Sequence, residues 1–346
     1  MRPRAPRLAI LGGIGAMTAL LARCSGLSGL PPVPDSVTAK DAGLDALARW
    51  DDEARRVGRG LDEAERERFA SAAPEDPVDG ARFALDRIAR GEGTAGLPLL
   101  ARALEKDPGD LVLGNVYRME VVRLKRQFLS EARSRGERMP ELPGYLRDEP
   151  SRSLERIAAA RESREIRLQI ALAHVDRMVL SPALEIKAPA SIDAVHALTA
   201  ILEEHPHYVP ALVGRGLNYL YRPRNLVWPE RPPPPHDAAS RDLSLAVAVG
   251  ARVGGASARL RGILLAILGD GYAREGRVDL ARSWWALARG TSDAAVVRGI
   301  VGARMGWRDV DVPDRLDEHL DERMADMDHP ASDLSFLWSA RARGPS

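Results

Sequence analysis

The sequence has few aromatic residues, a single cysteine and almost no excess of charge of either sign. Aromatic residues are 5% of the 346. Since strands are enriched in aromatic residues, this scarcity and the abundance of Ala, Leu and Arg favour helices. The lone Cys24 excludes an intrachain disulfide and a cysteine-based metal cluster. Fifty basic and 49 acidic residues leave a net charge of +1, which gives no electrostatic support for a nucleic-acid partner.

Catalytic sequence motifs are also missing. The chain has no G-x-S-x-G, no P-loop, no H-E-x-x-H and no dinucleotide-binding fingerprint. We therefore predict no catalytic residue, no cofactor and no metal. Paired carboxylates can act without a sequence motif, so an enzyme with an unrecognised site stays open as an alternative.

Apolar residues are sufficient for a large core. They make up 45% of the chain, and charged residues 29%, which excludes wholesale disorder. The length predicts about two domains, at roughly 150 residues each.

The first 24 residues have the features of a targeting segment. Arg2, Arg4 and Arg7 precede an uncharged run of fifteen residues, 8–22. That run fits the apolar region of a signal peptide and is short for a membrane span of roughly 20 residues. Residues 25–36 are rich in Gly, Ser and Pro and are predicted to form a flexible tether.

Leu21-Ala22-Arg23-Cys24 resembles the lipobox of bacterial lipoproteins, in which the cysteine is acylated. Arg23 departs from the small residue usual before that cysteine. The resemblance implies lipidation at Cys24 and a periplasm-facing protein of the cell envelope. An uncleaved anchor and ordinary secretion remain alternatives.

From residue 37 onward, apolar residues recur at helical spacing, and no good alternating strand pattern occurs. One amphipathic stripe begins the body, and another lies near its end, at Leu316, Leu320, Met324 and Met327. Pro, Gly and Ser mark breaks between helices at 74–80, 91–96, 140–150, 181–191 and 222–236. The sequence predicts an all-α body over 37–346.

One segment, 262–295, has the spacing of a 34-residue helical repeat. It contains Leu-x2-Leu-Gly-x2-Tyr, followed at the expected distances by Ala, a large aromatic residue and Ala. We expect the glycine and the first alanine to lie where two helices cross closely, and the Tyr and Trp to fill the space between repeats. These predicted repeat-packing residues are Leu265, Leu268, Gly269, Tyr272, Ala281, Trp285 and Ala288.

A second match covers 191–221, where Leu212, Gly216 and Tyr219 take the corresponding positions. Gly216 precedes Gly269 by 53 residues, which is one repeat plus a 19-residue insertion. A weaker match spans 83–108. The stretch 111–180 has a helical pattern without a repeat frame.

This spacing resembles the tetratricopeptide repeat family. The resemblance implies an α-solenoid of helix hairpins in a right-handed superhelix, whose concave face binds a protein or peptide. Its function would be that of a non-catalytic scaffold in the envelope. The architecture is also similar to the T-component lipoproteins of TRAP-type solute transporters, which is the alternative.

The insertion 222–237 carries four consecutive prolines and Trp228. It is either a loop packed on its own repeat or a stiff arm that contacts a partner. Trp284, next to Trp285, is a second candidate for partner contact.

Two further groups of polar residues have ordinary explanations. His205, His207 and His319 are expected at a helix end or on a solvated helix face, because no further ligands stand nearby. A basic group on one helix is expected to form an ordinary solvated surface; it comprises Arg118, Arg123, Lys125 and Arg126.

Overall fold

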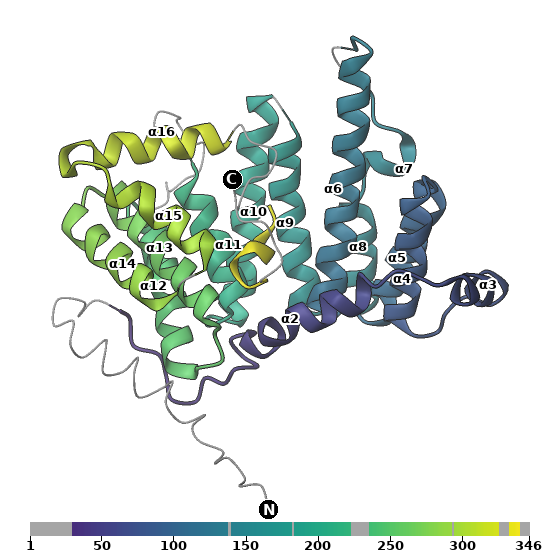
Figure 1. Ribbon diagram of the computed structural model, residues 1–346, viewed down its shortest axis with the longest axis horizontal. Coiled ribbons are helices and arrows are strands. Elements are labelled where there is room, and N and C mark those ends of the chain that lie inside the picture. Colours follow the sequence, from purple (N-terminus) through teal and green to yellow (C-terminus); the bar gives the residue numbers. More distant parts are fainter. Residues whose placement is uncertain are drawn as a thin grey trace, which may run out of the picture.

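The computed structural model describes residues 30–137, 140–181, 183–222, 235–292, 294–324 and 332–339 (Figure 1). Within them the regular structure is entirely helical, with fifteen α-helices and two short 3-10 helices. The prediction of an all-α body is therefore confirmed. The signal segment with Cys24, residues 25–29 of the tether, Trp228 and most of the proline-rich insertion lie outside the described residues.

The helices in chain order are α2 (Leu44–Val57), α3 (Glu63–Ser71), α4 (Pro77–Ala89), α5 (Gly93–Lys106), α6 (Leu111–Ser134), α7 (Gly144–Arg147), α8 (Ser151–Ala160), α9 (Arg164–Leu180), α10 (Leu184–Glu204), α11 (Val209–Leu220), α12 (Ala238–Val253), α13 (Ala258–Arg274), α14 (Val278–Thr291), α15 (Ala295–Met305), η1 (Asp309–Asp311), α16 (Val312–Met324) and η2 (Leu334–Leu337).

Local sequence signals set many helix ends. Asp110, Ser163 and Ser257 cap α6, α9 and α13, each accepting a hydrogen bond from a backbone N–H of the first turn. Gly276 takes a φ of 79° in the turn between α13 and α14, a conformation that side chains with a Cβ disfavour.

The break predicted over 181–191 is shorter in the structure. Helix α10 begins at Leu184 and runs through Pro189. Pro189, the sixth residue of this helix, cannot donate the usual hydrogen bond to the carbonyl of Glu185, yet the helix continues past it. The Pro and Ser residues of 181–191 therefore mark the start of a helix and not a loop of eleven residues.

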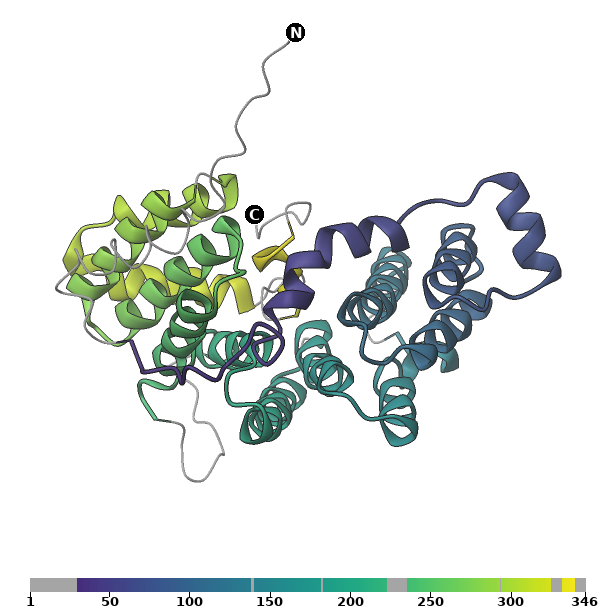
Figure 2. The same cartoon turned by 90° about the horizontal axis from the view of Figure 1, so that it is seen from below.

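The helices pack mainly as hairpins of sequence neighbours. The most extensive contacts join α4 with α5, α9 with α10, α11 with α12, and α13 with α14. Figure 2 shows these hairpins following one another along an arc, with α2 running along the inside of the arc. One continuous apolar cluster extends from α2 to η2 and forms the core.

Residues 30–36, predicted as part of the flexible tether, lie against this body. Leu30 and Val33 pack on the core, and Asp35 pairs with Arg252 of α12. The backbone N–H of Val209 donates to the carbonyl of Ala42 at 3.1 Å, so the chain just before α2 is tied to the start of α11.

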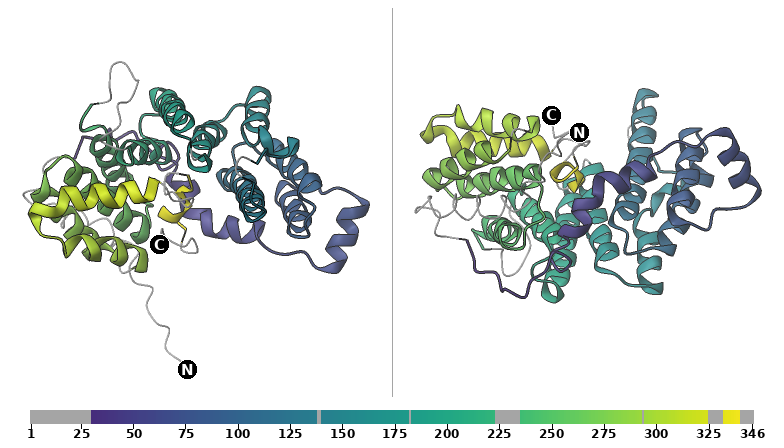
Figure 3. Two further views of the ribbon diagram at one scale, coloured as in Figure 1. Left: turned by 90° about the horizontal axis from the view of Figure 1, so that it is seen from above. Right: turned by 60° about the horizontal axis from the view of Figure 1, so that its bottom comes forward.

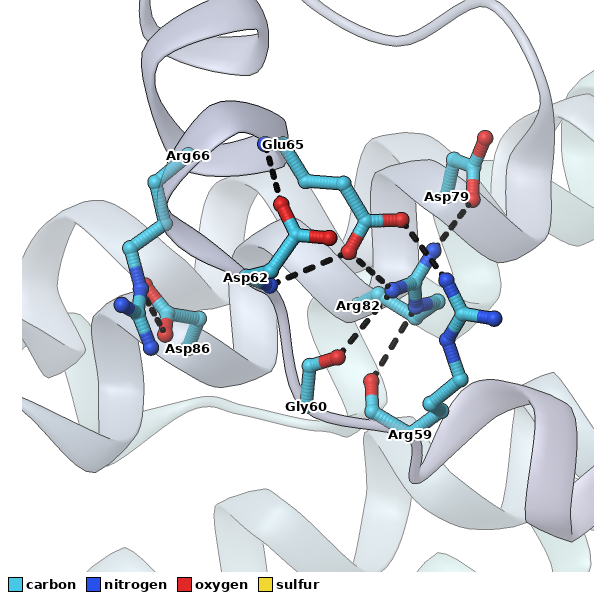
Figure 4. Close-up of polar contacts among 8 residues, drawn as sticks. All are labelled: Arg59, Gly60, Asp62, Glu65, Arg66, Asp79, Arg82 and Asp86. Atoms are coloured by element: carbon cyan, nitrogen blue, oxygen red, sulfur yellow. Dashed lines mark hydrogen bonds and ion pairs between the residues drawn. The ribbon is translucent and has the colours of Figure 1, made fainter.

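Helix α3 projects from one end of the arc (Figure 1) and is held mainly by polar contacts. Arg82 of α4, which is 7% exposed, donates to the carbonyls of Arg59 and Gly60 and to the carboxylates of Glu65 and Asp79 (Figure 4). Asp62 and Glu65 form a reciprocal capping box at the start of α3. A small separate apolar cluster of Leu61, Phe69 and Phe83 completes the attachment.

Candidate functional site

The predicted repeat-packing residues of α13 and α14 meet at a close helix crossing. A Cβ on Gly269 would lie 2.5 Å from two atoms of the Trp285 ring. The Trp285 indole N–H is shared between the Ala266 carbonyl at 3.1 Å and Asp270 at 3.0 Å, so the ring is fixed in place. The other predicted members are also buried, namely Leu265, Leu268, Tyr272, Ala281 and Ala288.

The matching position in the preceding hairpin has the same geometry. A Cβ on Gly216 of α11 would lie 2.9 Å from Leu243 of α12. Leu212 is 1% exposed, whereas Tyr219 is only half-buried. In the weaker upstream match, a Cβ on Gly96 of α5 would lie 2.5 Å from Ile88 of α4.

The structure places Trp284 in the core and not on a surface. Its side chain is 2% exposed and stacks on Tyr272 of α13, with ring centroids 6.4 Å apart. Contact of Trp284 with a partner is therefore not supported, because the ring is used within its own hairpin. The adjacent Trp residues project from α14 in different directions, yet helices cover both.

Three helices that open successive hairpins, α9, α11 and α13, share an inner face that holds the segment Ser332–Ser339. The Ser332 hydroxyl donates to Asp176 of α9 at 2.5 Å. A Cβ on Gly214 of α11 would lie 3.6 Å from the Leu334 side chain. Arg259 of α13 donates twice to the Phe336 carbonyl, at 3.0 and 2.8 Å. All residues of the segment are buried except Asp333, which is half-buried.

Helix α2 covers the other side of this segment. The rings of Trp50 and Trp338 meet edge to face at 5.4 Å, and the Ser339 hydroxyl donates to Asp51 at 2.6 Å. Both views of Figure 3 place η2 next to α2. The inner side of the arc is thus filled by the chain's own N-terminal helix and C-terminal segment.

The prediction that the basic group on α6 forms a solvated surface is partly wrong. Arg118 is fully buried, and its guanidinium binds both carboxylate oxygens of Asp176 at 2.7 Å as well as Gln169 and Asn115. Burial raises the pKa of the Asp176 carboxyl, and Arg118 and Ser332 oppose the rise. The pairing partner lies 58 residues along the chain from Arg118, beyond any local pattern. Arg123, which is exposed, fits the prediction.

Lys125, from the same group, is 9% exposed and borders a cavity of about 720 Å³. The walls come from α6, α8, α9, the start of α10 and the chain around α7. The ammonium of Lys125 donates to the backbone carbonyls of Glu149, at 2.5 Å, and Arg147, at 3.4 Å. Burial lowers the pKa of this ammonium, and the Asp176, Glu149 and Asp148 carboxylates oppose the fall.

Glu149 separates this cavity from a smaller hollow of about 400 Å³ and lines both. Its carboxylate accepts hydrogen bonds from Tyr117 at 2.6 Å, Ser153 at 2.9 Å and Arg152 at 3.0 Å. Burial, and then the bond to Glu149, raise the pKa of the Tyr117 hydroxyl far above its usual value. Neither hollow could be predicted from the sequence, because each is lined by residues from several helices that only the folded chain brings together.

The described residues contain no cluster of three or more side chains suited to a metal ion. His205 is the C-terminal cap residue of α10. Among the helices that the structure describes, none is long and apolar enough to cross a membrane.

Comparison with known proteins gives no relative for this chain: no family model, no curated protein and no solved structure matches it.

Proposed function

We propose that this chain is a non-catalytic interaction scaffold of the tetratricopeptide type, whose inner face binds a peptide-like segment of a partner at the cell envelope. The observation that carries the proposal is the segment Ser332–Ser339 on α9, α11 and α13. Its apolar side chains are buried, and its backbone is held by Arg259. A partner peptide would require the same contacts.

The hairpin order and the close crossings at Gly216 and Gly269 support the repeat architecture. A right-handed superhelix of such hairpins would place the first helix of each on the concave side. The segment Ser332–Ser339 rests on three of these first helices. We infer that it acts as an intramolecular occupant of the binding groove.

The test uses the full chain and a labelled peptide with the sequence of residues 332–339. In the unsubstituted chain the tethered segment should exclude the peptide, because a short tether gives an effective concentration of about millimolar. Phe336→Ala should weaken the tethered copy, so that micromolar peptide binds and raises fluorescence anisotropy. Val310→Ala, at a side chain that is 79% exposed, is the matched control.

A scrambled peptide should bind to none of these chains. If Phe336→Ala keeps its helical circular dichroism and binds the authentic peptide no better than the scrambled one, the groove proposal fails.

Envelope attachment is proposed from Cys24 and the apolar run before it. Mass spectrometry of the protein from membrane fractions should find an acylated N-terminal Cys24 peptide. An intact peptide of residues 1–7 would contradict lipidation. Co-purifying solute-binding or membrane subunits of a transporter would favour the accessory-lipoprotein alternative.

A further inference from the structure

The cavity beside Lys125 has the size and the walls of a small-molecule site. Its volume of about 720 Å³ falls within the range of ligand pockets, roughly 300–1,000 Å³. Much of the wall is apolar, with Val122 and Leu129 from α6, Ala173 and Leu180 from α9, and Ile186 from α10. Ile186 is 42% exposed, unusual for a large apolar side chain in the described part of the chain.

Most charged groups of the lining are neutralised by a partner. Arg152 pairs with Glu149 at 3.0 Å, and Arg177 pairs with Asp193 at 3.0 Å. Arg147 pairs with Glu141, and Asp176 is held by Arg118. The carboxylates of Asp148 and Glu155 belong to exposed residues and are solvated.

Lys125 differs from these groups. It is nine-tenths buried, yet no carboxylate of the described residues lies within ion-pair distance of its ammonium, which donates only to two carbonyls. An ammonium has three donors, so one N–H remains for a group in the cavity. A buried charge without a counter-ion is costly, and an anion from outside would remove that cost.

We propose that this cavity binds a small organic anion with one carboxylate and an apolar body, with Lys125 as its counter-ion. The carboxylate would accept a charge-assisted hydrogen bond from the Lys125 ammonium. The apolar body would lie against the α6 and α9 walls and leave water. A single negative charge fits better than a dianion, because Asp176 and Glu149 stand nearby and, among the described residues that line the cavity, Lys125 is the one cation without a carboxylate in ion-pair distance.

This site is separate from the inner face that holds Ser332–Ser339, so either proposal can fail alone. Asp176 borders both, but its carboxylate is already bound by Arg118 and Ser332.

The test is isothermal titration of the full-length protein with 4-phenylbutyrate and with octanoate, which distinguish aromatic from aliphatic bodies. The uncharged 4-phenylbutanol and 1-octanol serve as matched probes. We expect the better carboxylate to bind at least about tenfold more tightly than its alcohol, as for one charge-assisted hydrogen bond. Lys125→Met should remove that preference and leave the affinity for the alcohol unchanged.

Arg123→Met, on the exposed face of the same helix, should keep the preference. Ala173→Phe should fill the cavity and weaken the carboxylate and the alcohol together. Circular dichroism melts establish that each variant is folded. The proposal is overturned if neither carboxylate binds at millimolar concentration, if alcohol and carboxylate bind equally, or if folded Lys125→Met retains the preference.

Discussion

Buried ion pairs connect helices that lie apart in the sequence. Arg118 of α6 pairs with Asp176 of α9, and Arg304 of α15 pairs with Asp270 of α13 through two hydrogen bonds of 2.6 and 2.9 Å. Asp270 also accepts from the Trp285 indole, so one carboxylate joins α13, α14 and α15. Such a pair need not make the protein more stable than apolar residues in the same place would. Removal of one partner, however, leaves an uncompensated buried charge. They therefore disfavour any other alignment of these helices.

Glycine at the helix crossings gives a sharp residue-scale prediction. Gly269→Ala would place a methyl group 2.5 Å from the ring of Trp285, which two hydrogen bonds hold in position. We expect overpacking to lower the free energy of unfolding by about 1–3 kcal/mol despite the better helix propensity of Ala. Urea unfolding followed by circular dichroism measures the change.

Gly299→Ala in α15 is the matched control. Apart from its chain neighbours and the backbone of its own helix, no atom lies within 4 Å of its added Cβ, so only helix propensity changes. This variant should gain about 0.5–1 kcal/mol. Equal effects of the two substitutions would show that the crossing is not tight.

At the element scale, helix α3 depends on polar contacts more than on apolar burial. Only Phe69 of this helix is buried. Hydrogen bonds from Arg82 and from the Asp62 backbone lower the pKa of the Glu65 carboxyl to about 2. Because the folded-state pKa lies below the ordinary value, the ionised carboxylate stabilises α3 above about pH 4.5, and this contribution is lost as the pH falls toward 2.

Hydrogen exchange tests this pH dependence. After correction for intrinsic rates, the amides of α3 should lose protection between pH 6 and pH 3 relative to those of α4. Glu65→Gln should have reduced protection at both values, with little change between them. Protection of α3 that is equal at pH 6 and pH 3 in the unsubstituted chain would contradict this role of Glu65.

Sequence periodicity could predict the helices and the hairpins with tight crossings, because both follow from spacing within about 34 residues. It could not predict the surroundings of Arg118 and Lys125. Each resembles a surface residue in its own helix, and only the packing of α6 against α9 and the chain before α8 buries them. The burial of Trp284 could not be predicted for a related reason. Its neighbour Trp285 fits the repeat pattern, and nothing in the local sequence shows that Tyr272 covers Trp284 as well.

On the scale of the whole molecule, helix α2 and the segment Ser332–Ser339 contact each other on the inner side of the arc. In an array of hairpins, each unit contacts mainly its neighbours, and cooperativity depends on the contacts between units. Here Trp50 and Trp338 bring α2 and the C-terminal segment together, and Ser339 bonds to Asp51 across 288 positions of sequence. Arg164 of α9 binds the carbonyls of Lys40 and Asp41 beside them. These contacts join distant units directly.

Trp338→Ala should therefore separate the halves of the molecule. The lost ring is 7% exposed, and its removal should cost about 3–5 kcal/mol. We expect the unsubstituted chain to unfold in urea with one transition by circular dichroism and tryptophan fluorescence, and the variant to show two. Trp284→Ala removes another buried ring, 2% exposed, whose stacking partner belongs to the same hairpin, so it should lower stability and keep one transition. A single, merely shifted transition for Trp338→Ala would mean that packing between successive hairpins alone couples the arc.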